Sequence, residues 1–322
     1  MTTGDTFDVV TFGETMIRHS VAPGERLETA HGTEMRAAGA ESNVAVTVGR
    51  LGGETAWLSK LPDSPLARHV EASLRTHGVT PLVAPSEEGR VGVYYLEPAG
   101  APRGTNVVYD RESAAVRTAT PEELATEHVE RAEAFYTSGI TPALSTTLAD
   151  TTRTLLDRAA AADTHTVFDL NYRAKLWSHE ECRATCEPLF DAVDTLVVAE
   201  RDARTVLSRE GSAADIGAEL AADHDCETVL VTRGAEGALA VHDGETVEQG
   251  AFDADTFDPI GTGDAFVGGY LARWLDGESV RDSMAYGAAT AALKRTIGGD
   301  VATVTPDEVE RVLDSDTSAI ER

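Results

Sequence analysis

Short apolar runs alternate with amphipathic segments along most of the chain. The first run, DVVTFGE from Asp8 to Glu14, is typical of a buried strand that ends in a turn. Similar runs predict strands at 55–61, 134–140, 166–171, 195–199, 228–232 and 238–242. Between them, apolar residues fall at helical spacing, as they do from Leu66 to Leu74 before the helix stop Gly78. The pattern predicts an α/β fold with a mostly parallel central sheet covered by helices on both faces.

Two stretches, residues 16–38 and 89–116, interrupt this alternation. Each contains strand-like runs without a helix between them, so we expect them to pair as a small antiparallel sheet beside the main one. The second stretch is rich in aromatic and basic side chains, although the chain is only 6% aromatic: Tyr94, Tyr95, Tyr109 and Arg111. This concentration favours a lid that faces a ligand over two ordinary surface hairpins. Without an internal repeat or a long linker, residues 1–322 are expected to form a single domain.

The charge balance is strongly acidic, with 55 acidic and 27 basic residues and a formal net charge of −28. Nucleic acid is therefore excluded as a partner, because phosphate backbones are bound by basic patches. Lysine is depleted: only Lys60, Lys175 and Lys294 are lysines among the 27 basic residues. High salt screens the repulsion of such an acidic surface, so the composition predicts a halophilic protein.

The chain contains neither a basic segment followed by an apolar signal sequence nor an apolar window long enough to cross a bilayer. We therefore expect a cytoplasmic protein with no membrane partner. Its three cysteines are too few and too irregularly spaced for a disulfide framework, which agrees with that location.

The most informative segment is DPIGTGDAFVGGYLARWL, residues 258–275. Apolar residues after Asp264 fall at helical spacing, so Gly261 and Gly263 are expected at a helix N-terminus. Free amides and the helix dipole attract anionic oxygens there, as in a phosphoryl group. Asp264, in the first turn, is placed to take a proton from a substrate hydroxyl. The alternative is that Asp264 only caps the helix.

Other phosphate-binding loops fit this segment less well. Its glycines give GxGxxxxG near the end of the chain, whereas a dinucleotide-binding loop has GxGxxG after the first strand. A Walker P-loop is excluded because no lysine follows a glycine.

Two further glycine-rich segments carry candidate binding residues. In AGAESNVAVTVGRLG, residues 38–52, Gly39 allows close backbone approach, and Asn43 offers a donor and an acceptor to a polyhydroxy ligand. A plain capped helix is the alternative for this segment. In VLVTRGAEGALAV, Thr232 and Gly234 follow a buried strand, at the position where α/β sheets bind ligands.

Together these motifs resemble those of the ribokinase-like (PfkB) family of carbohydrate kinases over essentially the whole chain. The family's late motif, usually DTxGAGDxF, is DPIGTGDAF here. The resemblance implies a ribokinase-like three-layer domain with a small β-sheet lid, and phosphoryl transfer from ATP with Mg²⁺. It implies that Asp264 is the catalytic base and that Gly261, Thr262 and Gly263 form the anion hole. It also implies nucleotide contacts by Thr232, Gly234, Gly237, Gly261, Gly263 and Ala288.

One family motif is altered here. The Asn-x-x-Glu motif, linked to magnesium and phosphate, is replaced by Ala199 to Asp202, which leaves Glu200 and Asp202 as candidate metal ligands. The resemblance also favours a homo-oligomer, since such lids often pair between subunits, and it allows activation by K⁺.

Within the family, the chain most resembles the 2-keto-3-deoxygluconate kinases. That subgroup has a lid tyrosine, a Tyr-x-Arg and a DxNxRxxLW stretch, which match Tyr95, Tyr109 with Arg111, and DLNYRAKLW with Arg173. Two arginines suit a carboxylate, because a guanidinium binds it with paired hydrogen bonds. Alternatively, Arg173 orients the phosphates and Arg111 is a solvated lid residue. The sugar pocket implied by the resemblance comprises Gly39, Asn43, Tyr95, Tyr109, Arg111, Ile140, Arg173, Asp264 and Asp300.

The implied reaction transfers the γ-phosphoryl group of ATP to the terminal hydroxyl of 2-keto-3-deoxygluconate, in a modified Entner-Doudoroff pathway. The galacto epimer differs at one hydroxyl and stays open as a substrate. One alternative is a fructokinase or ribokinase that acts on a neutral sugar. Another is a non-catalytic sensor of sugar and nucleotide, which the altered Asn-x-x-Glu motif favours and the intact Asp264 opposes.

Overall fold

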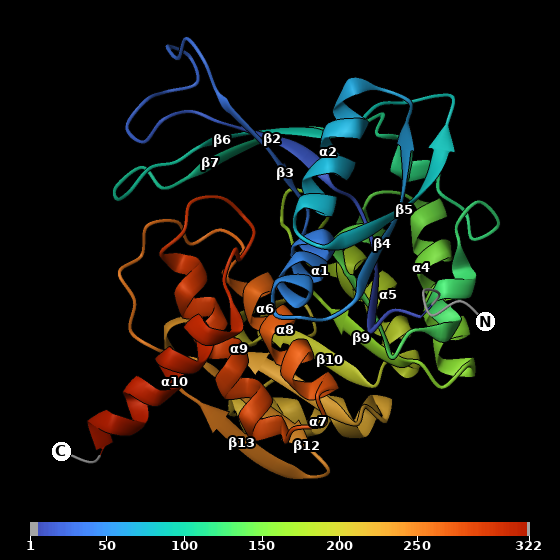
Figure 1. Ribbon diagram of the computed structural model, residues 1–322. Coiled ribbons are helices and arrows are strands. Elements are labelled where there is room, and N and C mark those ends of the chain that lie inside the picture. Colours follow the sequence, from blue (N-terminus) through green and yellow to red (C-terminus); the bar gives the residue numbers. More distant parts are fainter. Residues whose placement is uncertain (1–5, 321–322) are drawn as a thin grey trace.

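A nine-stranded sheet forms the centre of the computed structural model, which describes residues 6–320 (Figure 1). Its strand order is β13-β12-β11-β10-β9-β8-β1-β4-β5, and all neighbours from β11 to β5 pair in parallel. The strands are β1 Val9–Phe12, β4 Thr55–Pro62, β5 Val79–Ser86, β8 Ala134–Ser138, β9 His165–Asp169, β10 Thr195–Ala199, β11 Thr228–Thr232, β12 Ala238–His242 and β13 Glu245–Gln249. The mostly parallel sheet predicted from the sequence is thus confirmed, with an antiparallel hairpin, β12-β13, at one edge.

The two strands that the apolar pattern does not predict lie at the two edges of this sheet. β5 contains Pro81 and Pro85, which an edge strand tolerates because one side of its backbone has no ladder partner. β13 is ETVEQ, whose side chains are mostly polar and exposed. Neither strand carries the continuous apolar run that marks a strand buried on both faces.

Helices cover both faces of the sheet. They are α1 Ala40–Arg50, α2 Pro65–Thr76, α3 Ile140–Ala143, α4 Thr146–Ala161, α5 His179–Cys186, α6 Glu200–Thr205, α7 Ala213–His224, α8 Thr262–Leu275, α9 Val280–Arg295 and α10 Pro306–Ile320. Apolar residues of α4 to α7 pack on one face, and those of α1, α8 and α9 pack on the other. The result is a three-layer domain (Figure 1). None of these helices is long and apolar enough to span a membrane.

A second sheet of four strands, which we call the lid, has the order β3-β2-β6-β7. Its strands are β2 Met16–Ser20, β3 Glu34–Ala38, β6 Val93–Glu97 and β7 Asn106–Asp110. They lie within the two predicted lid segments and above α8 and α9 in the view of Figure 1. The prediction of a purely antiparallel sheet is wrong, because β2 and β6 pair in parallel. β2 follows β1 and β6 follows β5, and since β1 and β5 run the same way, both continuations leave the main sheet in one direction.

The chain order of the strands places a crevice near β1. From β1 the chain proceeds to β4 and β5 on one side, and later to β8, β9, β10 and β11 on the other. Ligands of open α/β sheets bind at such switch points, beyond the carboxyl ends of the strands. Gly39 permits α1 to begin there, because a Cβ at this position would collide with the carbonyl oxygen of Glu14.

Candidate active site

Two adjoining cavities lie at the carboxyl edge of the main sheet. The first, which we call the central pocket, has a volume of about 470 Å³ and is bounded by the ends of β8 to β11, the start of α8 and the lid. The second, which we call the adjoining pocket, has a volume of about 270 Å³ and lies between β11, α8 and α9. Thr232, Thr262 and Gly263 line both cavities. The N-terminus of α8 therefore stands at their junction.

Most of the residues predicted from the sequence meet in these cavities. The central pocket is lined by these predicted residues: Gly39, Asn43, Tyr109, Ile140, Arg173, Asp202, Thr232, Gly261, Thr262, Gly263, Asp264 and Asp300. The adjoining pocket is lined by these: Thr232, Gly234, Gly237, Thr262, Gly263 and Ala288. Tyr95, Arg111 and Glu200 line neither cavity. Segments more than 200 residues apart in the sequence thus form one site.

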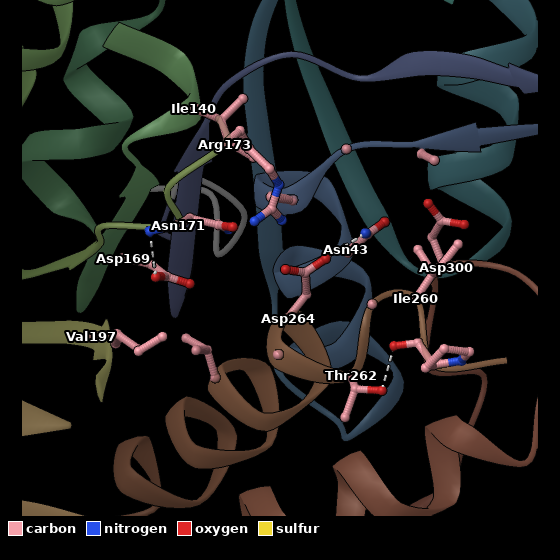
Figure 2. A pocket seen from close by; sticks show the side chains of 18 of the residues that line it. Asn43, Ile140, Asp169, Asn171, Arg173, Val197, Ile260, Thr262, Asp264 and Asp300 are labelled. Carbon is pink, nitrogen blue, oxygen red and sulfur yellow. Dashed lines mark hydrogen bonds between the residues drawn. The ribbon is translucent and has the colours of Figure 1, made fainter. Parts of the chain in front are cut away.

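Asp264 projects into the central pocket from the first turn of α8 (Figure 2). Its side chain does not cap the helix, because Asn43 Nδ2 donates to Asp264 Oδ2 at 2.7 Å. Burial raises the pKa of Asp264 to about 6, against the opposing effects of the Asn43 hydrogen bond and the Arg173 charge. The carboxylate is therefore ionised at neutral pH and still close enough in pKa to accept a proton from a hydroxyl during transfer.

The turn before Asp264 depends on glycine at one position. Gly261 caps α8 with φ of 78°, a left-handed conformation that favours glycine, and a Cβ there would collide with the Asp300 carbonyl oxygen. Thr262 braces the turn by donating its hydroxyl to the Pro259 carbonyl oxygen at 2.7 Å. The first amides of α8 lack partners within the helix and lie at the junction of the two cavities, where they suit an anion.

Two further carboxyl groups lie close to Asp264. Asp169, at the end of β9, lines the central pocket, and burial together with the Asp264 charge raises its pKa to about 7. Glu41, in the first turn of α1, is fully buried and accepts hydrogen bonds from Ser138 at 2.7 Å and Thr141 at 2.8 Å. Burial raises the pKa of Glu41 to about 7 as well. Burial, with the Asp264 charge acting on Glu41 and Asp169, therefore makes each of the three carboxyl groups hold a proton more readily than an exposed acid.

The lid contributes Tyr94 rather than Tyr95 to the central pocket. Tyr94 donates its hydroxyl to Asp300 at 2.6 Å, and Arg18 of β2 also binds the Asp300 carboxylate. Tyr95 instead stacks on His19, with ring centroids 5.4 Å apart, and faces away from the site. Tyr95 was nominated from the resemblance, and the pattern of this strand does not show which tyrosine faces the pocket, because apolar residues occupy all neighbouring positions from Val93 to Leu96.

Arg111 is neither in the central pocket nor solvated, so both expectations for it differ from the structure. It is buried against Glu14, with Arg111 Nη1 and Glu14 Oε2 2.8 Å apart. Its guanidinium lies 4.6 Å from the ring centroid of Tyr109, which does line the pocket. Arg111 therefore supports the pocket wall from behind.

Arg173 and Asp169 of the DLNYRAKLW segment enter the central pocket beside Asn171 (Figure 2). The sharp bend that brings them together includes Asn171, with φ of 39°, whose amide donates to Asp169 Oδ1 at 3.0 Å. Of this motif, only Arg173 was predicted from the sequence as a residue of the site. The spacing of two polar residues after a buried strand would have indicated Asp169 too.

Of the two candidate metal ligands, only Asp202 lines the central pocket. Its carboxylate is 4% exposed and accepts from Arg201 Nε at 2.9 Å. Glu200 points elsewhere and binds Arg204 within α6, at 2.6 Å. No cluster of three or more potential metal ligands occurs among the described side chains, residues 6–315. A magnesium ion bound here would therefore be held through few carboxylates together with phosphate oxygens and water, as is usual for this ion.

The adjoining pocket is made of small residues. Gly234 and Gly237 on the strand side face Ala288, Ala291 and Ala292 of α9. Gly237 has φ of 88°, and a Cβ there would collide with the backbone of the β13 end. Small side chains leave room for a flat ring, and the cavity opens onto the phosphate-attracting start of α8.

The two cavities, the carboxylate and the anion-binding turn define a phosphotransferase that takes a nucleotide on one side and an alcohol on the other. The chain belongs to the pfkB family of carbohydrate kinases, whose model matches residues 6–307. This family uses ATP and Mg²⁺, and the adjoining pocket and Asp202 fit these two groups.

Relatives extend over nearly the whole chain. A 2-dehydro-3-deoxygalactonokinase of Haloferax volcanii is 61% identical over 98% of this chain and 100% of its own length. A 2-dehydro-3-deoxygluconokinase of Thermoproteus tenax is 27% identical over 95% of this chain and 94% of its own. A crystal structure of 2-dehydro-3-deoxygluconokinase from Thermotoga maritima aligns with a TM-score of 0.90 and 29% identity, covering 96% of this chain and 98% of that one.

Proposed function

We propose that this kinase phosphorylates a 2-keto-3-deoxy sugar acid at its terminal hydroxyl, taking either 2-keto-3-deoxygluconate or its galacto epimer. The observation that carries the proposal is that Arg173 and Asp264 face the same pocket, so one site can hold a carboxylate and activate a hydroxyl (Figure 2). The Haloferax volcanii relative supports the galacto epimer as a substrate. The step would belong to a modified Entner-Doudoroff pathway in the cytoplasm, where ATP is available.

Each part of the site has a role in the proposed reaction. The Asp264 carboxylate, oriented by Asn43, accepts the proton of the attacking hydroxyl. Amides of Gly261 to Gly263 and the α8 dipole stabilise the charge on the transferred phosphoryl group. Magnesium, held by Asp202 and the phosphates, would neutralise phosphate charge.

The sugar contacts come from several elements of the protein. The hydroxyl groups would be surrounded by residues of the lid, of α1 and of the loops at the sheet edge: Gly39, Asn43, Tyr109, Ile140 and Asp300. Tyr94 joins this set, because its hydroxyl is held by Asp300 within the pocket wall. Arg111 contributes indirectly by supporting Tyr109.

The experiment measures ADP release in concentrated KCl with both sugar acids, fructose and ribose. We expect kcat/KM for a sugar acid to exceed that for fructose by about a hundredfold or more, because a neutral sugar has no carboxylate for Arg173 to bind. Arg173→Met is expected to raise KM for the acid and to leave KM for ATP unchanged. A raised KM for ATP together with an unchanged KM for the acid would show that Arg173 orients the phosphates.

Two other results would assign the protein differently. Equal kcat/KM for fructose or ribose would make it a neutral-sugar kinase. Binding of ATP and the acid without turnover would make it a sensor.

We also propose that the protein assembles into a homo-oligomer through the outer face of the lid. Met35 and Val108 are 39% and 47% exposed on this sheet, beside a cavity lined by Tyr95. A second copy could bury these apolar side chains. Light scattering in concentrated KCl tests this, and a monomeric mass would contradict it.

A further inference from the structure

Lys294 is a fully buried charge close to the candidate active site. It is one of three lysines in the chain, lies in the last turn of α9 and is 0% exposed. Lys294 Nζ donates to two main-chain oxygens, of Asp258 at 3.0 Å and of Ile297 at 3.2 Å. Among the side chains of residues 6–315, no carboxylate forms an ion pair with this ammonium. Carbonyl oxygens are also the groups that replace the water around a bound monovalent cation in proteins.

The other buried lysine makes a different kind of contact. Lys60, on β4, is 7% exposed, pairs with the carboxylate of Glu123 at 2.6 Å and also donates to the Thr118 carbonyl oxygen at 3.3 Å. It lines neither the central nor the adjoining pocket. Lys60 therefore differs from Lys294 in having a carboxylate partner, and it offers a matched control.

The two carbonyls that bind Lys294 belong to the two loops that shape the anion-binding turn. Asp258 begins the turn that leads to Gly261, and its carboxylate accepts from the amides of Ile260 and Gly299, each at 3.0 Å. Ile297 begins the loop that leads to Asp300, against whose carbonyl oxygen Gly261 packs. The ammonium therefore joins both loops immediately before they meet at the start of α8.

The charges around Lys294 explain why a cation is needed at this place. Asp258, Asp300 and Asp264 face it from the first loop, the second loop and α8, and Arg18 faces it from β2 of the lid. Arg18 is already engaged with both Asp300 and Asp258. Without the ammonium, the charges of Asp258, Asp300 and Asp264 would be offset by Arg18 and, at Asp264, by Arg173 alone, which is costly in a low dielectric.

We propose that Lys294 is a positioning residue for phosphoryl transfer, whose ammonium acts as a built-in monovalent cation that clamps the 258–263 turn to the 297–300 loop. It touches neither the sugar nor the nucleotide. By fixing the turn, it holds the first amides of α8 where the phosphoryl charge develops. Turnover then has no specific need for added K⁺ at this position. The proposal rests on kinase activity and not on which sugar is accepted.

The first test compares Lys294→Met with Lys60→Met, using the best sugar substrate in concentrated KCl. We expect kcat of Lys294→Met to fall by about tenfold to a hundredfold, with little change in KM for ATP, because a misplaced turn weakens the transition state more than binding. Lys60→Met is expected to keep its kcat, even where its Tm falls. A Lys294→Met variant that folds and has the kcat of the wild type would overturn the proposal.

A pH profile separates positioning from loss of stability. The Lys294 charge lowers the pKa of Asp264. The acidic limb of kcat/KM should therefore move to higher pH in Lys294→Met and stay in place in Lys60→Met. In Lys294→Ala, added methylammonium is expected to restore part of the lost kcat. If the acidic limb of kcat/KM does not move in Lys294→Met, and methylammonium does not restore kcat in Lys294→Ala, then Lys294 is only a packing residue.

The wild-type protein provides a test that needs no variant to fold. Turnover is compared in KCl, NaCl and tetramethylammonium chloride at equal concentration, with Tm recorded in each salt. The built-in cation predicts similar kcat in all three salts where the protein is folded, and a specific demand for K⁺ would overturn the proposal. Failure of the wild type to phosphorylate any sugar acid while it phosphorylates another sugar would count against the proposed substrate alone.

Discussion

The two cavities of the site are lined by different kinds of side chain. The central pocket contains four charged side chains, of which Arg173 is exposed and three are buried or partly buried and held by a neighbour or a turn: Asp169, Asp264 and Asp300. The adjoining pocket is lined mainly by glycine, alanine and threonine, with Arg295 tied to the Phe252 carbonyl oxygen at 2.7 Å. Charge is therefore concentrated in the cavity that contains Asp264 and sparse in the adjoining one.

This difference has an energetic consequence. Burying a charge costs free energy unless partners compensate for it, so each carboxyl group of the central pocket needs support from elsewhere in the fold. Asn43 supplies it for Asp264, and Arg18 with Tyr94 supplies it for Asp300. The adjoining pocket needs only space, which small side chains leave free. Substitutions in the central pocket should therefore change kcat and stability, whereas substitutions in the adjoining pocket should change KM for ATP.

The largest effect is expected from Asp264→Asn in the central pocket. Loss of the base should lower kcat by about 10²- to 10⁴-fold, the usual contribution of general base catalysis. The dissociation constant for ATP should stay near the wild-type value, because the adjoining pocket is untouched. Turnover assays and nucleotide titrations measure the two quantities. Equal turnover by variant and wild type would remove Asp264 from the base role.

The same variant should be more stable than the wild type at neutral and higher pH. Burial raises the folded-state pKa of Asp264 to about 6 from 3.8, so the stability that the protonated form contributes is lost as pH rises through this window. Above about pH 7 the gap should reach about 3 kcal/mol at most, from roughly two pKa units, and below about pH 6 it should shrink.

Denaturant unfolding of both proteins between about pH 5 and 8 measures this gap. Asp157→Asn, at an exposed position on α4, is the control and should show a gap that does not change with pH. A constant gap for Asp264→Asn would mean that burial does not destabilise the Asp264 carboxylate.

The smallest effect is expected from Ala288→Leu in the adjoining pocket. The larger side chain takes space next to Gly234 and Gly237, so KM for ATP should rise by about tenfold, equivalent to 1.4 kcal/mol of lost binding. KM for the sugar should not change. Initial rates with each substrate varied in turn distinguish the two cavities. A matching rise in KM for the sugar would show that the cavities do not act separately.

Parts of the site that depend on local pattern could be predicted. The DPIGTGDAF turn was readable because glycines before a helical apolar repeat indicate a helix N-terminus wherever they occur. The strand end at Thr232 follows from a buried apolar run in the same way. These features concern residues that are neighbours in the chain.

Other parts depended on packing between distant segments. Tyr94 and Tyr95 are equally apolar neighbours, and only pairing of β6 with β2 and β7 decides which one faces the pocket. Arg111 was expected beside the ligand, but Glu14, 97 residues earlier in the chain, binds it in the lid base. The partners of a charged side chain cannot be predicted from spacing alone, because opposite charges far apart in the chain compete for it.

The sequence by itself determined the α/β class, the anion-binding turn, the carboxylate at Asp264 and the kinase family, because these follow from periodicity and short motifs. Only the tertiary structure decided which tyrosine enters the pocket, that Asp202 and not Glu200 lies within it, and that Lys294 joins the loops on either side of Gly261. The reason is physical. Periodicity shows that a residue is buried, whereas its partner is set by long-range register and by the need to compensate each buried charge.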